Sequence, residues 1–163
     1  MPDESSHRLV AIGSDHAGFK LKEKLKEEIA GMGYGVLDMG TDSDDSCDYP
    51  DFALPVAEAV SRNKAWRGVL ICGSGAGMTM VANKVPGVRA ATCNDSYAAE
   101  YCRLHNDANI VTMGARIINE VQAGNIARAF LETAYEGNEP DGYRHAARLY
   151  KLEQVESKYM KEQ

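Results

Sequence analysis

Residues 68–89 read G-V-L-I-C-G-S-G-A-G-M-T-M-V-A-N-K-V-P-G-V-R, and the order of residue types in this segment decides the fold. The apolar run 69–71 predicts a strand that delivers Cys72 to a turn with glycine at every second position. Residues 78–84 are compatible with a helix that ends at a Pro-Gly pair. A glycine turn at a helix start directs backbone N–H groups toward an anion. The segment therefore predicts a site where an anion lies beside a thiol.

Apolar runs and amphipathic stretches alternate along the rest of the chain. The apolar runs predict strands at residues 8–14, 34–39, 69–72, 88–93 and 108–113. The amphipathic stretches predict helices at residues 19–30, 51–62, 78–84, 96–104, 119–135 and 143–160. This alternation predicts an α/β fold, a three-layer α/β/α sandwich in which a five-stranded parallel, Rossmann-like sheet lies between helical layers.

Two of the expected helices follow the last strand. The helix at 119–135 should turn Val121 toward the core together with the larger apolar residues that follow it. The helix at 143–160 trails past the sheet, and we expect it to extend to a partner subunit.

Composition and charge restrict the class of protein. The chain has 163 residues, which suits one domain with a real core, and we expect that domain at 8–163 after a disordered tail at 1–7. A net charge of -6 argues against nucleic acid and against an anionic membrane surface as partners. The apolar runs are too short to span a bilayer, and the first residues lack the pattern of a signal peptide. We therefore expect a cytoplasmic protein.

The four cysteines form no C-x-x-C pair, so a zinc knuckle or a thioredoxin-type site is not expected. The glycine turn also lacks G-x-G-x-x-G, the Gly-Lys-Ser/Thr of a P-loop, and the arginine of a cysteine-dependent phosphatase loop. A short nest of amides with Cys72 at its base remains.

Cys72 has two readings, a small buried residue that ends a strand or a functional thiol. A glycine turn at a helix start favours the thiolate, which can act as nucleophile or as general base. Ser74 could donate to an oxyanion, or could be a small residue chosen for a turn.

Other candidates follow the strands or lie on the last helix. In a parallel sheet the ligand binds beyond the carboxyl ends of the strands, which favours Asp15 and His16. His105 lies between a helix and a strand, where it is either functional or a capping residue. Arg144 and Arg148 are one helical turn apart, and suit a phosphate unless they form a solvated face.

Together these segments resemble the ribose-5-phosphate isomerase B family, within the group that includes galactose-6-phosphate isomerase subunits. The likeness covers residues 9–149. Its motifs are G-S-D-H-A-G at 13–18, D-Y-P at 48–50, I-C-G-S-G-A-G at 71–77, A-N-K-V-P-G-V-R at 82–89, H-N-D-A-N at 105–109, G-A-R at 114–116, and R-H at 144–145. The resemblance implies a five-stranded α/β/α sandwich, an aldose–ketose isomerase of sugar phosphates without metal or cofactor, and active sites between two subunits.

The resemblance also implies a role for each candidate. Cys72 would be the base that removes the C2 proton, with Ser74 and the amides of Gly73, Gly75 and Gly77 around the oxyanion. His105 would assist ring opening with Asp15 opposite, while Tyr49 and Asn106 orient hydroxyl groups. The phosphate would be held by His16, Arg116, and Arg144 and Arg148 of the partner subunit, with His145 as a further candidate.

Met78 provides an internal check on the base. Some members of the family use a glutamate just after the glycine turn and have no cysteine at the strand end. Here Met78 stands at that position and Cys72 is present, so the two agree on a thiol base.

The substrate and the assembly stay open at this point. Ribose 5-phosphate with ribulose 5-phosphate is the expected pair, and a six-carbon substrate such as allose 6-phosphate or galactose 6-phosphate is the alternative. A phosphosugar-binding module without activity would not need the thiol, and a cysteine hydrolase would lack a base within the turn. The expected assembly is a homodimer, with a tetramer as the other possibility.

Overall fold

The computed structural model describes residues 8–160, so the tail expected at 1–7 lies outside the described residues. Its strands are β1 (Leu9–Ser14), β2 (Gly35–Asp38), β3 (Arg67–Cys72), β4 (Ala90–Thr92) and β5 (Ile110–Gly114). Its helices are α1 (Phe19–Gly31), α2 (Tyr49–Ser61), α3 (Ala76–Ala82), α4 (Ser96–Leu104), α5 (Glu120–Glu132) and α6 (Tyr143–Met160), and two short 3-10 turns at Glu136–Asn138 and Pro140–Gly142 precede α6.

The five strands form one parallel sheet in the order β2-β1-β3-β5-β4, as the sequence predicted. Chain order reverses between β1 and β3, and such a switch point opens a crevice beyond the carboxyl ends of the strands. Register aligns Ser14 with Ile71 and Cys72 with Gly114. The last residues of β1, β3 and β5 therefore reach the same edge of the sheet.

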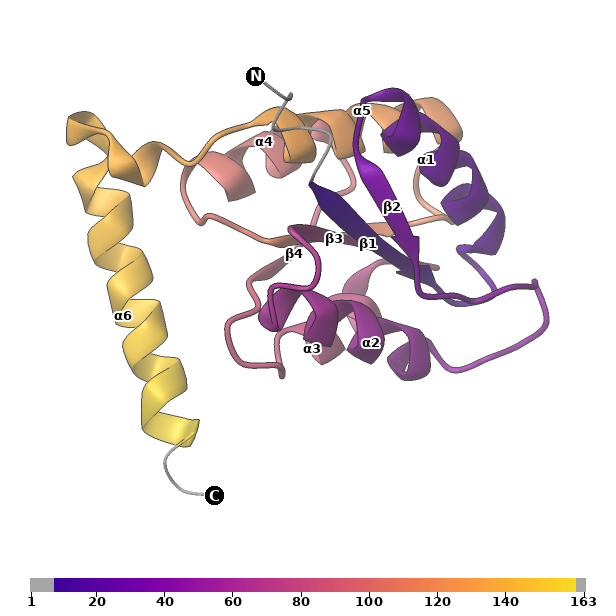
Figure 1. The fold of residues 1–163 in the computed structure, drawn as a ribbon, viewed down its shortest axis with the longest axis horizontal. Helices are drawn as coiled ribbons and strands as arrows, with labels where there is room; N and C mark the ends of the chain where they lie inside the picture. Colours follow the sequence, from indigo (N-terminus) through magenta and orange to yellow (C-terminus); the bar gives the residue numbers. More distant parts are fainter. Residues whose placement is uncertain (1–7, 161–163) are drawn as a thin grey trace.

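Alternating side chains of the strands build two cores, which gives the expected three layers (Figure 1). On one face Val69 and Ile71 of β3 pack with apolar residues of α1, α4 and α5. On the other face Leu70 and Cys72 pack with α2 and α3. Because β3 is buried along its whole length, its position and that of Cys72 are fixed by both cores.

The core face of α5 differs from the expectation at its first turn. Val121 is 72% exposed, whereas Ala123 and Ile126 are fully buried. A helix turns about 100° per residue, so Val121 lies about 200° from Ala123 around the axis. The start at Glu120 is fixed by a capping box of Asn119 and Gln122, which leaves Val121 on the solvent side.

Helix α6 projects away from the sandwich (Figure 1). Within α6, His145 is the only buried residue, and the apolar side chains of Leu152, Val155 and Tyr159 are exposed. A cavity of ≈ 880 Å³ lies between α6 and the segment around 83–91. Across it the Gly87 N–H donates a hydrogen bond to Oε1 of Glu156 at 2.9 Å. No helix in residues 8–160 is long and apolar enough to cross a bilayer.

Candidate active site

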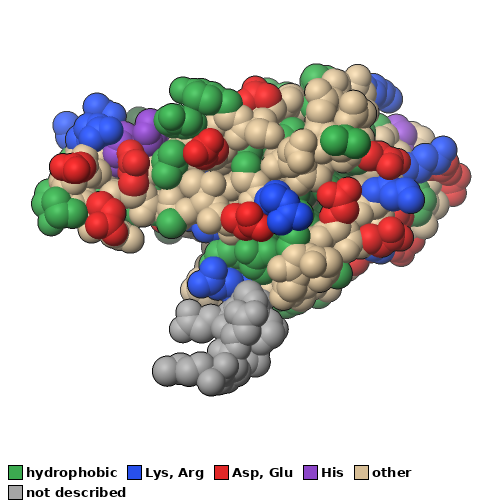
Figure 2. Space-filling model, turned by 90° about the horizontal axis from the view of Figure 1, so that it is seen from above, with side chains coloured by type: hydrophobic (Ala, Val, Ile, Leu, Met, Phe, Trp, Pro, Cys, Tyr) green, Lys and Arg blue, Asp and Glu red, His purple; other side chains and the backbone are tan. Residues whose placement is uncertain are grey.

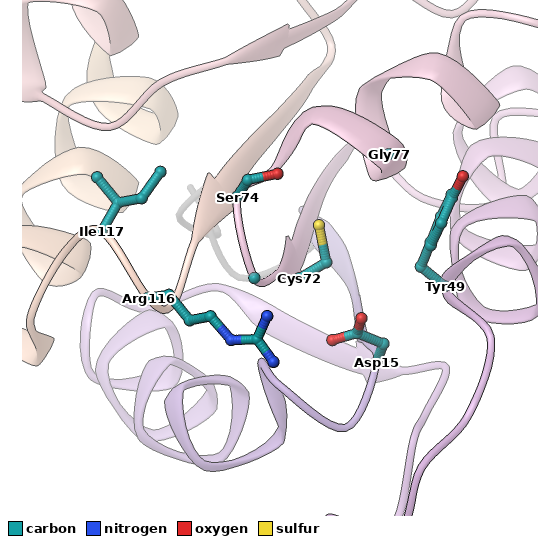
Figure 3. Close-up of a pocket in the computed structure, with 8 residues that line it drawn as sticks. Asp15, Tyr49, Cys72, Ser74, Gly77, Arg116 and Ile117 are labelled. Carbon is teal, nitrogen blue, oxygen red and sulfur yellow. The ribbon is translucent and has the colours of Figure 1, made fainter.

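A pocket of ≈ 390 Å³ opens at the carboxyl ends of β1, β3 and β5 (Figure 3). Its walls come from the segments that follow these strands and from the start of α2. The residues that line it are Asp15, Tyr49, Cys72, Gly73, Ser74, Gly77, Arg116 and Ile117. Seven of these eight residues were predicted from the sequence, and they meet because parallel strands end at one edge.

The Cys72 side chain lies at the base of this pocket and is 5% exposed. The backbone N–H of Gly75 donates a hydrogen bond to its Sγ at 3.1 Å. This bond fixes the position of the sulfur within the turn. The turn thus places backbone amides beside the thiol, and the same side chain also packs against the core formed with α2 and α3.

Gly75 allows this turn because its φ is +86°, a left-handed conformation that costs other residues energy. Its carbonyl accepts hydrogen bonds from the hydroxyls of Thr79 at 3.2 Å and Thr112 at 3.0 Å. These bonds tie the turn to α3 and β5. The amides of the turn are consequently held in place before any ligand binds.

Gly77 provides space for the aromatic wall of the pocket. A Cβ at this position would lie 2.8 Å from the ring of Tyr49, closer than carbon atoms pack. Tyr49 is 39% exposed at the start of α2, and its ring stands beside the turn in Figure 3. The ring can therefore close one side of a bound sugar while its hydroxyl stays available for a hydrogen bond.

Asp15 and Arg116 bring opposite charges to the pocket. Asp15 is buried, and one of its carboxylate oxygens accepts a hydrogen bond from the Gly18 N–H at 3.2 Å. Arg116 is exposed, and its guanidinium group extends toward Asp15 in Figure 3. The backbone N–H of Arg116 also donates to the Gly73 carbonyl at 3.1 Å. A carboxylate and a guanidinium group thus lie on the same side of Cys72 (Figure 3).

His16 lies next to Asp15 in the chain but does not line the pocket. Its Nδ1 accepts a hydrogen bond from the Cys47 N–H at 3.2 Å, so the ring is anchored to the loop before α2. The same contact holds Cys47 against the His16 ring, which agrees with a structural role for this cysteine. The ring nitrogen that remains, Nε2, is the one available to a ligand.

The other predicted residues lie at the opposite edge of the sheet. His105 ends α4 just before β5 begins, and Asn106 lines the cavity beside α6. Arg144 and Arg148 are exposed on α6. Each crossover helix returns the chain to the amino ends of the strands, so this group cannot meet Cys72 within the chain. The structure brings together one half of the predicted set and separates the other half from it.

The histidine cluster, which we define as His105, Glu136 and His145, is the centre of this second group. Oε1 of Glu136 lies 3.3 Å from Nε2 of His105 and 2.9 Å from Nε2 of His145. The two imidazole rings stack with centroids 4.1 Å apart. Burial lowers the pKa of His145 and the positive charge of Arg144 lowers it further, while the carboxylate of Glu136 opposes both effects.

Sequence reasoning missed Glu136 and Ile117. Ile117 follows Arg116 directly and enters the pocket with the same loop. Glu136 lies nine positions before His145 in the chain, a spacing that predicts no contact by itself. The two residues meet because the 3-10 turns fold the chain back on itself before α6 starts.

Comparisons with known proteins agree with this geometry. Residues 10–152 match the family model described as Ribose/Galactose Isomerase. A solved ribose-5-phosphate isomerase B from Clostridium thermocellum is 44% identical, with a TM-score of 0.88 over 93% of this chain and 99% of that one. A Mycoplasma genitalium ribose-5-phosphate isomerase B with bound ribulose-5-phosphate is 36% identical, with a TM-score of 0.86 over 93% and 98%. A 4-deoxy-4-sulfo-D-erythrose isomerase of Clostridium sp. strain MSTE9 is 45% identical over 79% of this chain and 82% of its own.

Proposed function

The chain belongs to the ribose/galactose isomerase family and is a sugar-phosphate aldose–ketose isomerase, and we propose that it interconverts ribose 5-phosphate and ribulose 5-phosphate. The observation that carries the proposal is the buried Cys72 thiol, which accepts a hydrogen bond from a preformed amide turn at the base of a pocket. The Mycoplasma genitalium relative, with its bound ribulose-5-phosphate, supports the choice of a five-carbon sugar.

In the proposed reaction the Cys72 thiolate removes the proton on C2 of the open-chain aldose. The electron pair of that C–H bond forms the C1–C2 double bond of an enediolate, and the charge moves to the oxygen on C1. Ser74 and the amides of the glycine turn stabilise this oxygen, each good donor contributing about 3 kcal/mol. Cys72 then returns the proton to C1, while the proton on O2 is transferred to O1, so that C2 becomes the carbonyl of the ketose and C1 carries the hydroxyl group.

Ring opening needs a further acid–base group, and no histidine lines the pocket in the part of the chain described. Asp15 provides one carboxylate. We assign the second role to His105 of the partner subunit, because His105 of the same chain lies at the other edge of the sheet. The proposed assembly is a homodimer in which each active site takes residues from both subunits. A tetramer, the alternative assembly, would contain two such dimers.

Helix α6 supports such an assembly because it leaves apolar side chains uncovered and starts beside the histidine cluster. A second copy that covers this helix would bring Asn106, Arg144 and Arg148 toward the first copy's pocket. In this arrangement Asn106 and Tyr49 orient the sugar hydroxyls. His16 and Arg116, together with Arg144 and Arg148 of the partner subunit, bind the phosphate. We assign each proton transfer to side chains of the protein, with no metal and no organic cofactor.

A panel of sugar phosphates tests the proposed substrate. Aldose and ketose phosphates of four, five and six carbons are compared by kcat/KM, with the sulfonated erythrose as a fourth arm because one relative acts on it. We expect the ribose and ribulose phosphates to have the highest kcat/KM. A higher value for allose 6-phosphate or galactose 6-phosphate would replace the substrate. Binding of these sugars without turnover of any of them would leave a phosphosugar-binding module.

A further inference from the structure

The histidine cluster has the composition of a metal site, with two imidazole nitrogens and one carboxylate oxygen. All three atoms lie within 4.8 Å of one another. In Figure 2, histidine, basic and acidic side chains gather at the left end of the molecule, where α6 begins. Imidazole nitrogen and carboxylate oxygen are ligands that Zn²⁺ and similar divalent transition-metal ions bind.

The carboxylate–His105 distance agrees with tetrahedral coordination, and the carboxylate–His145 distance is shorter. With Zn–N and Zn–O bonds of about 2.0–2.2 Å, two ligand atoms of a tetrahedral site lie about 3.3 Å apart. Glu136 Oε1 lies 3.3 Å from His105 Nε2 and 2.9 Å from His145 Nε2. The two rings are stacked, with only 8° between their planes, so one imidazole must rotate about its Cβ–Cγ bond to turn both lone pairs toward one ion.

His145 supplies an independent observation. Its side chain is 3% exposed, and among residues 8–160 its Nε2 finds no hydrogen-bond partner. The contact with Glu136 is short enough for a hydrogen bond but does not have the direction of one. A buried polar atom without a partner is costly, and its lone pair can be satisfied by a ligand.

We propose that His105, Glu136 and His145 bind Zn²⁺, with water at the fourth position, and that the bound ion inhibits the isomerase. Inhibition rests on the proposed function, because the metal would occupy the imidazole assigned to ring opening. Binding itself does not depend on that role. The site is therefore regulatory in kind, and the reaction proceeds without the metal.

The positive charges of Arg144 and Arg148 weaken the binding of a metal ion at the cluster. The Arg144 guanidinium lies 3.8 Å from Oε1 of Glu136, where it competes with a cation for the same oxygen. Its side chain is 57% exposed and can move toward solvent when an ion binds. A phosphate bound by Arg144 and Arg148 would hold both guanidinium groups away from the Glu136 carboxylate. Removal of Arg144 should consequently strengthen metal binding, whereas removal of a ligand should weaken it.

Isothermal titration with ZnCl₂ in the background Cys47→Ser and Cys72→Ser tests the proposal, since this background removes two competing thiols near the surface or the pocket. We expect one ion per chain. Glu136→Gln and His145→Asn should each raise the Kd for Zn²⁺ at least about tenfold, and Arg144→Gln should lower it. Glu139→Gln and His16→Asn are the matched controls, and their Kd should not change.

Absence of Zn²⁺ binding, or an unchanged Kd in Glu136→Gln, would overturn the site. Glu136 is partly exposed, so its substitution to glutamine keeps the test decisive even where His145→Asn does not fold, as circular dichroism would show. In the wild-type chain, Zn²⁺ should inhibit turnover and EDTA should restore it. Turnover without metal tests the isomerase independently, so failure of one proposal is distinguished from failure of the other.

Discussion

The Cys72 pocket and the histidine cluster lie at opposite edges of the same sheet, and they differ in what fixes their polar groups. In the pocket, backbone amides are set by a glycine turn that both cores hold in place. In the cluster, long side chains from α4, a 3-10 turn and α6 meet around one carboxylate. The pocket has a thiol without an imidazole, and the cluster has imidazoles without a thiol. In the proposed reaction, each edge of one chain supplies one half of an active site.

The largest expected effect comes from removing the thiol of the pocket. Cys72→Ala should lower kcat by about 10²–10⁴-fold, the usual contribution of a general base, with little change in KM. Steady-state kinetics with the proposed pentose phosphates measure it. Cys47→Ala is the control, since its side chain lies beside His16 and outside the pocket. Normal turnover in Cys72→Ala would remove the thiol-base mechanism.

Mixed dimers test whether the two edges combine between subunits. Cys72→Ala and His105→Asn should each be inactive alone, and refolding them together should restore about a quarter of wild-type activity. This fraction follows because half of randomly formed two-fold dimers are hybrids, and each hybrid has one intact site. Mixtures of each variant with itself serve as the control. If co-refolding leaves activity at the level of the separate variants, the shared site is wrong.

The turn beneath the pocket should respond strongly to a single methyl group. Gly75→Ala places a side chain at φ +86°, with its Cβ 3.1 Å from the backbone of Met113. We expect a loss of about 1–3 kcal/mol in the free energy of unfolding from strain and crowding. Urea denaturation measures it. Gly31→Ala is the control, because no atom lies within 4 Å of its Cβ, and an unchanged stability of Gly75→Ala would contradict the geometry.

The smallest effect concerns the cluster and pH. Burial and the charge of Arg144 lower the pKa of His145 in the folded protein below its ordinary value of 6.5. In the window below pH 6.5 the unfolded chain binds more protons, so the stability that is complete above 6.5 falls as the pH drops through the folded pKa. His145→Asn should reduce this slope. Denaturation at several pH values from about 7.5 to about 5 measures it, and identical slopes for both proteins would contradict the assignment.

Much of the pocket could be predicted because its residues follow strands directly. Asp15 comes one residue after β1, and Cys72 ends β3, so the parallel sheet alone places them together. Val121 was misplaced because the cap at Asn119, and not the apolar pattern, sets the first turn of α5. His105 was predicted as a site residue, but its distance from Cys72 depends on where α4 returns the chain.

By itself, the sequence determined the alternation of strands and helices and the glycine turn that carries Cys72, because both arise from local patterns and backbone freedom. Only the tertiary structure decided that Glu136 joins His105 to His145, and that these groups lie across the sheet from the thiol. Such contacts depend on how crossovers and 3-10 turns return the chain through space, and no local spacing records that path.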